Sequence, residues 1–110
     1  MSDIRYAPEA EEDLARIKEY ISEELGNSTA ALNTVAKITK RIRSLEQFQE
    51  MGTRLSAIID LDTDYRFLVC ANYIAFYRTD GIHVCIARIL HGRRDYVKLL
   101  FSDLPQDEAE

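Results

Sequence analysis

Apolar residues in the first half of the chain recur at the three- and four-residue steps of an α-helix. Pro8 suits the first helical turn, and the apolar positions that follow it are Ala10, Leu14, Ile17, Ile21 and Leu25. Gly26 ends this helix, and Asn27 or Ser28 can cap the next one. The second apolar stripe consists of Leu32, Val35, Ile38, Ile42 and Leu45. Because the connection is so short, we expect an antiparallel helical hairpin.

The second half of the chain changes to a period of two, rich in β-branched and aromatic residues. This pattern predicts strands over residues 65–71, 73–79 and 82–90. Asn72 marks the first turn between them and Asp80-Gly81 the second, so we expect an antiparallel meander. A short strand before Pro8, over residues 3–7, completes the predicted order β-α-α-β-β-β.

A helical hairpin with one apolar stripe per helix must cover a partner surface, and the predicted sheet is the available one. The expected fold is therefore α+β in two layers, with an antiparallel sheet packed under the helical hairpin. The 110 residues suit one domain, which we place at residues 1–101. Residues 102–110 carry four carboxylates and no basic side chain, which favours a flexible acidic tail. At this size we expect a shallow site on the sheet face that the helices leave uncovered.

Composition narrows the class of protein further. Hydrophobic residues make up 46% and charged residues 30%, as in ordinary globular domains. No apolar run approaches the roughly 18 residues that span a bilayer, and no signal-peptide pattern opens the chain, so we expect a cytoplasmic protein without membrane contact. Cys70 and Cys85 lie within predicted strands and lack the spacing of a zinc site. We predict two reduced core thiols, no metal and no cofactor.

The net charge of −5 conceals an uneven distribution. Residues 26–101 carry a net charge of +4, whereas both ends of the chain are acidic. The overall acidity argues against a protein that coats nucleic acid, which requires an excess of Lys and Arg. On the second predicted helix, Lys37, Lys40 and Arg41 share a stripe that is either a solvated face or a binding surface.

Arginines dominate the candidate chemistry of the second half. Arg66 lies inside an apolar strand, and alternation places it with Leu68 and Cys70 on one face, which we expect to be the uncovered one. A second cluster surrounds Gly92 and comprises Arg88, His91, Arg93, Arg94 and Tyr96. Arginine clamps phosphates, and His and Tyr can move protons. Such a set could hold an RNA phosphate while the neighbouring 2′-hydroxyl attacks it, without a metal.

A structural role for the same residues stays open. Arg88 can pair with a carboxylate at the edge of the core, and Asp95 can fix Arg93 or Arg94 within the turn. His91 would then be a surface loop residue. Arginine clusters stabilise turns and interfaces as well as active sites.

Three segments of the sequence are similar to those of one known family. They are the Pro8-Glu9-Ala10-Glu11-Glu12-Asp13-Leu14 helix opening, the Tyr65-Arg66 and Tyr73-Ile74-x-Phe76-Tyr77 strands, and the Arg88-Ile89-Leu90-His91-Gly92-Arg93-Arg94-Asp95-Tyr96 run. Over residues 3–101 the chain resembles toxins of the RelE/ParE superfamily from bacterial type II toxin–antitoxin modules. The resemblance implies a growth-inhibiting toxin with a cognate antitoxin protein as its partner.

Two activities are known in this superfamily, and each implies different site residues. RelE-like members cleave mRNA on the ribosome, which implies catalytic roles for Arg66, Arg94, His91 and Tyr96. ParE-like members poison DNA gyrase, which implies target or antitoxin binding by Lys37, Lys40, Arg41, Arg88, Arg93 and Arg94.

Two departures from the nuclease pattern favour the ParE branch. Residues 60–64 carry three aspartates where RelE-like enzymes present lysines, and Leu100 or Phe101 stands where a catalytic tyrosine is expected. A degenerate, non-toxic interaction protein is a third hypothesis, because toxins of this superfamily are commonly basic. The sequence leaves a homodimer open.

Overall fold

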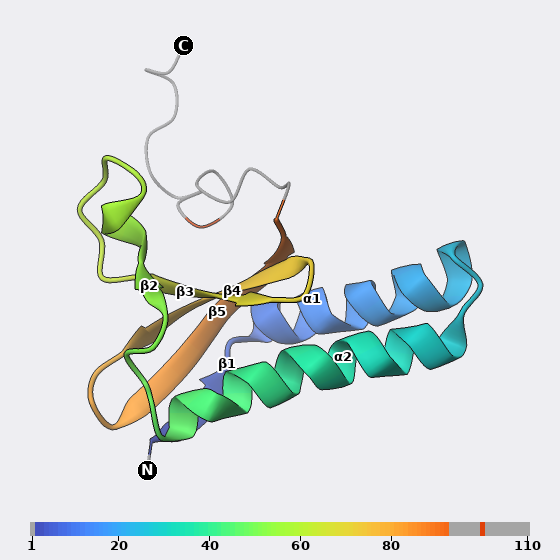
Figure 1. Cartoon of the computed structure of the whole chain (residues 1–110), viewed down its shortest axis with the longest axis horizontal. Coiled ribbons are helices and arrows are strands. Elements are labelled where there is room, and N and C mark those ends of the chain that lie inside the picture. The colour runs from blue at the N-terminus through green and yellow to red at the C-terminus, as the bar shows by residue number, and fades with distance from the viewer. Residues whose placement is uncertain (1, 93–99, 101–110) are drawn as a thin grey trace.

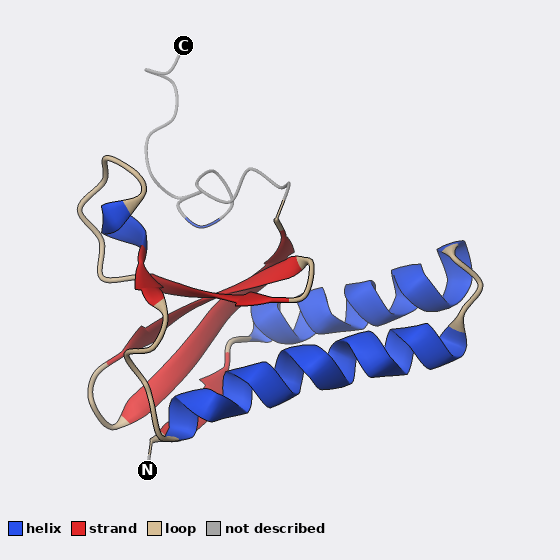
Figure 2. Ribbon diagram, in the orientation of Figure 1, coloured by secondary structure: helices blue, strands red, loops and turns tan. Residues whose placement is uncertain are grey.

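The structure is a computed structural model that describes residues 2–92 and Leu100 (Figures 1 and 2). Its helical elements are α1 (Pro8–Glu19), a π-helical turn (Tyr20–Glu24), α2 (Ser28–Arg43) and the 3₁₀ turns Ser44–Glu46 and Leu55–Ala57. Its strands are β1 (Asp3–Tyr6), β2 (Thr53–Arg54), β3 (Arg66–Cys70), β4 (Tyr73–Thr79) and β5 (His83–His91). The α+β fold is confirmed: both helices pack on one face of the sheet, as Figure 2 shows.

The sheet has the strand order β1-β5-β4-β3-β2. The predicted antiparallel meander is confirmed in β3, β4 and β5. Two features differ from the expectation of a four-stranded antiparallel sheet. Strand β1 pairs with β5 in parallel, and β2 is an unpredicted two-residue edge strand that pairs antiparallel with β3. Two residues are too few to produce a periodic signal, so β2 was not detectable in the sequence.

The core between helices and sheet contains the side chains that periodicity selected, except Leu25, Leu32 and the half-buried Val35. Its largest fully buried members are Ile38, Ile42, Leu45, Tyr77, Val84, Ile86 and Ile89. Leu25 and Leu32 are instead 60% and 59% exposed. The turn over residues 20–24 is π-helical, and its wider winding rotates Leu25 off the apolar stripe. Gly26 (φ 64°) then reverses the chain, and the Asn27 side chain accepts a hydrogen bond from the Ala30 N–H at 2.9 Å.

The outer face of the sheet, opposite the helices, is partly covered. A second apolar cluster there consists of buried Leu55, Phe76 and Leu90, against which Ile59, Tyr65, Phe67, Ile74 and Leu100 pack. The segment after β2 therefore covers part of the face on which we expected a site. Among the described residues, no helix is long and apolar enough to cross a membrane, and no group of three His, Cys, Asp or Glu side chains is arranged to hold a metal ion.

The two cysteines differ in environment, so the prediction of two core thiols is right for Cys70 and wrong for Cys85. Cys70 is 2% exposed, and burial raises its pKa to about 11. Cys85 is exposed, because alternation along β5 directs its neighbours Val84 and Ile86 into the core.

We expect one thiol per folded chain to react rapidly with a disulfide reagent at pH 8, and Cys85→Ser to abolish this fast reaction. Two fast thiols in the wild type would contradict the burial of Cys70.

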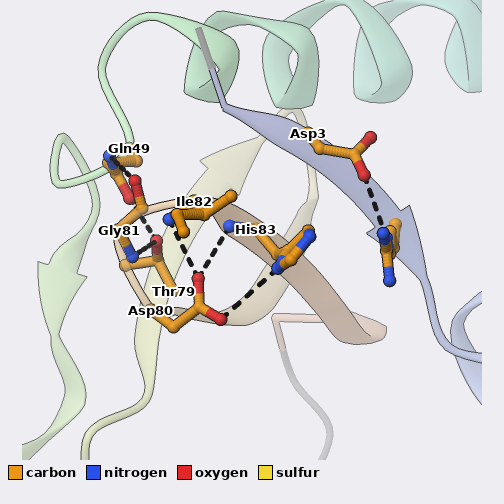
Figure 3. Close-up of polar contacts among 8 residues, drawn as sticks. Asp3, Gln49, Thr79, Asp80, Gly81, Ile82 and His83 are labelled. Carbon is orange, nitrogen blue, oxygen red and sulfur yellow. Dashed lines mark hydrogen bonds and ion pairs between the residues drawn. The ribbon is translucent and has the colours of Figure 1, made fainter.

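The β4–β5 hairpin contains an acid-sensitive contact (Figure 3). The Asp80 carboxylate accepts hydrogen bonds from the backbone N–H groups of Ile82 (2.9 Å) and His83 (2.7 Å), and these bonds lower its pKa from 3.8 to about 2. A carboxyl group whose pKa is lower in the folded protein than in the unfolded chain stabilises the fold at pH values above the unfolded pKa. This contribution disappears as the pH falls from about 4 to about 2. The melting temperature of Asp80→Asn should therefore lie below that of the wild type at pH 7 and converge with it near pH 2. A constant difference across this range would contradict the assignment.

Candidate functional site

Arg66 is the first residue of β3, and its side chain hydrogen-bonds to the segment that precedes β2. Its Nη1 group donates to the carbonyls of Gly52 (2.9 Å) and Glu50 (3.2 Å). Leu68 and Cys70, on the same side of β3, belong to the core beneath the helices. The expectation that Arg66 lies on the uncovered face is therefore wrong. The predicted alternation is correct, but the assignment of the two faces is reversed. Phe67 faces the outer cluster, while Leu68 and Cys70 face the helices.

Carboxylates surround the cleft beside Arg66. This cleft has a volume of about 330 Å³ and is lined by Arg54, Arg66, Ser56, Thr63, Thr79, Glu50, Asp62 and Asp64. Asp64 also accepts a hydrogen bond from Arg78 at 2.8 Å. The lining contains three carboxylates and two arginines, so the cleft is unfavourable for an RNA phosphate. The three aspartates of residues 60–64 led to the same expectation.

His91 lies at the other end of the sheet. Its ring meets Tyr73 edge-on, with 5.4 Å between the ring centroids. Arg66 is level with Tyr77 on β4, whereas His91 is level with Tyr73, four residues earlier in that strand. Four residues and two strand spacings separate the backbones of Arg66 and His91 by roughly 16 Å. The structure does not bring these two predicted catalytic residues together.

A second groove runs between the helical hairpin and the end of the sheet. Its volume is about 810 Å³, and its lining includes Arg16, Tyr20, Leu25, Lys37, Tyr73 and His91. Tyr20 and Leu25 are 53% and 60% exposed, so the groove offers an accessible apolar surface, and its lining also contains the cations Arg16 and Lys37 and the carboxylate of Asp13. Burial, followed by the proximity of Tyr20, raises the pKa of the Tyr73 phenol, which therefore stays protonated at neutral pH.

The predicted basic stripe of α2 divides between two surfaces. Lys37 lines the groove, as His91 does. Lys40 and Arg41 are exposed outside that lining, and the Arg41 Nε group donates to the Val69 carbonyl at 3.3 Å. The remaining predicted site residues Arg93, Arg94 and Tyr96, and the proposed contact of Asp95, lie outside the described residues.

Arg88 is held by Asp13, which the sequence singles out only as part of the Pro8–Leu14 helix opening. Asp13 is 5% exposed and accepts two hydrogen bonds from the Arg88 guanidinium, which is the core-edge pairing considered for Arg88. The bond to Asp13 raises the pKa of Arg88. A signal for Asp13 was available: it lies three residues after Ala10 and four before Ile17, within the apolar stripe of α1.

The family model for the ParE toxin of the type II toxin–antitoxin system parDE matches residues 4–96. Since that match covers most of the chain, the protein belongs to the ParE toxin family, within the RelE/ParE superfamily.

A solved structure at 22% sequence identity shares the fold. A chain described as "Chromosomal ParDE TA system from P. aeruginosa" superposes with a TM-score of 0.69 at 22% identity, over 83% of this chain and 96% of that chain. The structure described as YafQ from E. coli strain BL21(DE3) gives a TM-score of 0.46 at 16% identity, over 92% and 99% of the two chains. No curated protein sequence matched the chain.

Proposed function

We propose that this ParE-family toxin inhibits bacterial growth by binding and poisoning DNA gyrase, and that it is not a ribonuclease. Membership of the ParE family carries the proposal. The separation of Arg66 from His91 and the carboxylates beside Arg66 also speak against an mRNA-cleaving site. We assign Lys40 and Arg41, with Arg93 and Arg94, to target binding, because the first two are exposed outside the groove.

Induction of the chain in a bacterial host without its antitoxin tests this proposal. We expect growth arrest with DNA damage, defective plasmid supercoiling and intact mRNA. Arg66→Ala should retain at least half of the wild-type potency if it remains folded, because Arg66 bonds to its own loop rather than to a substrate. Arrest with normal supercoiling and rapid mRNA cleavage, abolished by Arg66→Ala, would instead establish the nuclease. Normal growth would identify a degenerate, non-toxic member.

The groove is proposed to bind the cognate antitoxin through an acidic segment with an apolar face. Such a segment would cover Tyr20, Leu25 and Tyr73 while its carboxylates approach Arg16 and Lys37. Lys37→Glu should weaken antitoxin affinity about tenfold or more by isothermal titration calorimetry, because it puts a negative charge into the groove. Lys40→Glu, one helical turn away and outside the groove, is the matched control and should change affinity less than threefold. Equal losses for the two variants would place the antitoxin elsewhere.

A further inference from the structure

Large apolar side chains are exposed at the end of the sheet where β4 turns into β5. Phe48 and Met51, in the loop between α2 and β2, are 63% and 39% exposed, and Ile82 in the β4–β5 turn is 67% exposed. The Gln49 side chain joins the loop to the turn, because its Nε2 group donates to the Gly81 carbonyl at 3.2 Å (Figure 3). We call Phe48, Met51 and Ile82 the apolar tip.

Hydrogen bonds to the sheet fix the loop that carries two of these side chains. The hydroxyl of the buried Tyr77 donates to the Gln49 carbonyl and accepts from the Gly52 N–H, both at 2.9 Å. Within the loop, the Met51 N–H donates to the Phe48 carbonyl at 3.0 Å. The exposed side chains therefore stand on an ordered backbone, and a preordered anchor loses less conformational entropy when it binds.

The apolar tip lies away from the groove that we assign to the antitoxin. That groove is lined by Asn72, Tyr73 and His91, at the end of the sheet where β3 turns into β4. Tyr73 and Thr79, at opposite ends of β4, are separated by roughly 20 Å. A segment bound in the groove therefore need not cover the tip.

The tip instead borders the basic residues that we assign to the target. The Phe48 N–H donates to the Ser44 carbonyl at 3.0 Å, so the helical winding continues beyond α2. Phe48 follows Arg41 by about two helical turns, or roughly 10 Å along the axis. The exposed side chains of Lys40 and Arg41 can therefore form one surface with the tip.

Carboxylates flank the tip and indicate the kind of partner that it fits. Glu46 and Glu50 lie two residues to either side of Phe48, and Asp80, 65% exposed, begins the β4–β5 turn. These charges repel DNA phosphates, and they repel their own counterparts on a second copy of the chain. They favour a protein surface on which basic side chains surround an apolar pocket.

We propose that the apolar tip is the part of the toxin that contacts its target protein, with Phe48 inserted into an apolar pocket that has a basic rim. This inference rests on the proposed function, because it names the surface with which the toxin grips its target. A few buried aromatic anchors commonly supply most of the binding energy of an interface. Lys40 and Arg41 then meet anionic groups of the target beside that pocket.

Phe48→Gln tests this role, and Leu32→Gln is the matched control. Leu32 has a similar exposure of 59% and lies on α2, outside the groove lining. Phe48→Tyr keeps the aromatic ring, and Glu50→Lys reverses one charge beside the tip. Growth-arrest potency without antitoxin and affinity for purified DNA gyrase are measured at a temperature at which circular dichroism shows each variant to be folded.

We expect at least tenfold lower potency and gyrase affinity for Phe48→Gln and about fivefold lower values for Glu50→Lys. Phe48→Tyr and Leu32→Gln should change both less than threefold. Affinity for the cognate antitoxin, measured by isothermal titration calorimetry, should also change less than threefold in Phe48→Gln.

Wild-type potency of folded Phe48→Gln would overturn the inference, as would equal losses in Phe48→Gln and Leu32→Gln. A tenfold loss of antitoxin affinity in Phe48→Gln, or a homodimer that this substitution dissociates, would assign the tip to another partner and overturn it as well. Potency of Glu50→Lys at or above the wild-type level would contradict the basic rim. A wild-type chain that arrests growth without binding gyrase would refute gyrase as the target, and the potencies would still decide the role of the tip.

Discussion

Replacing Asp13 by alanine should lower the free energy of unfolding by about 3–5 kcal/mol, because it leaves the Arg88 guanidinium half-buried without its partner. The Ile89 N–H loses its acceptor at the same time. Arg88 is only 19% exposed and cannot be fully hydrated in place. Urea unfolding at pH 7, followed by circular dichroism, measures the loss directly.

The double variant Asp13→Leu/Arg88→Met is the matched control. Two apolar side chains of similar size remove the uncompensated charge, so most of the lost stability should return, apart from the cost of the unpaired Ile89 N–H. Asp13→Ala within 1 kcal/mol of the wild type would show that the pair does not stabilise the fold as described.

Gly52→Ala is the second substitution with a large expected effect. A Cβ atom at this position would lie 2.5 Å from the Tyr77 hydroxyl and 2.7 Å from the Phe67 carbonyl oxygen. The Tyr77 hydroxyl accepts a bond from the Gly52 N–H and donates to the Gln49 carbonyl, both at 2.9 Å. Because Tyr77 is fully buried and Phe67 O is backbone, neither yields easily. We expect a loss of about 2–3 kcal/mol from overpacking and strained hydrogen bonds.

Gly92→Ala controls for the general effect of replacing glycine. Its nearest atoms would be at 3.7 and 3.8 Å, which is ordinary van der Waals contact. Differential scanning calorimetry should show a markedly lower melting temperature for Gly52→Ala and little change for Gly92→Ala. Similar shifts for both variants would contradict the close approach at Gly52.

The elements of this fold were predictable wherever local pattern and turn chemistry agree. The Asp80-Gly81 turn and the alternation from Tyr73 to Thr79 fixed the hairpin to within a residue. The parallel pairing of β1 with β5 was not predictable, because it depends on how the helical hairpin returns the chain to the sheet. The exposure of Leu25 depends on a π-helical turn that apolar spacing does not reveal.

The site was only partly predictable, for a different reason. Residue type selected His91 for the nuclease hypothesis and Lys37 for the binding hypothesis, and both side chains line one groove. Which face of β3 carries Arg66 depends on what covers each side of the sheet, and β3 is apolar on both. The role of Asp13 as the partner of Arg88 was not predictable, because the helix dipole already explains an acid near the start of a helix. The long-range contact with Arg88 spans 75 residues, beyond any local pattern.

Supercoiling by purified DNA gyrase in the presence of the purified chain tests the central claim most directly. We predict dose-dependent loss of supercoiling that is relieved by an equimolar amount of the cognate antitoxin, with no cleavage of mRNA on programmed ribosomes. Unimpaired gyrase together with cleaved mRNA would contradict it.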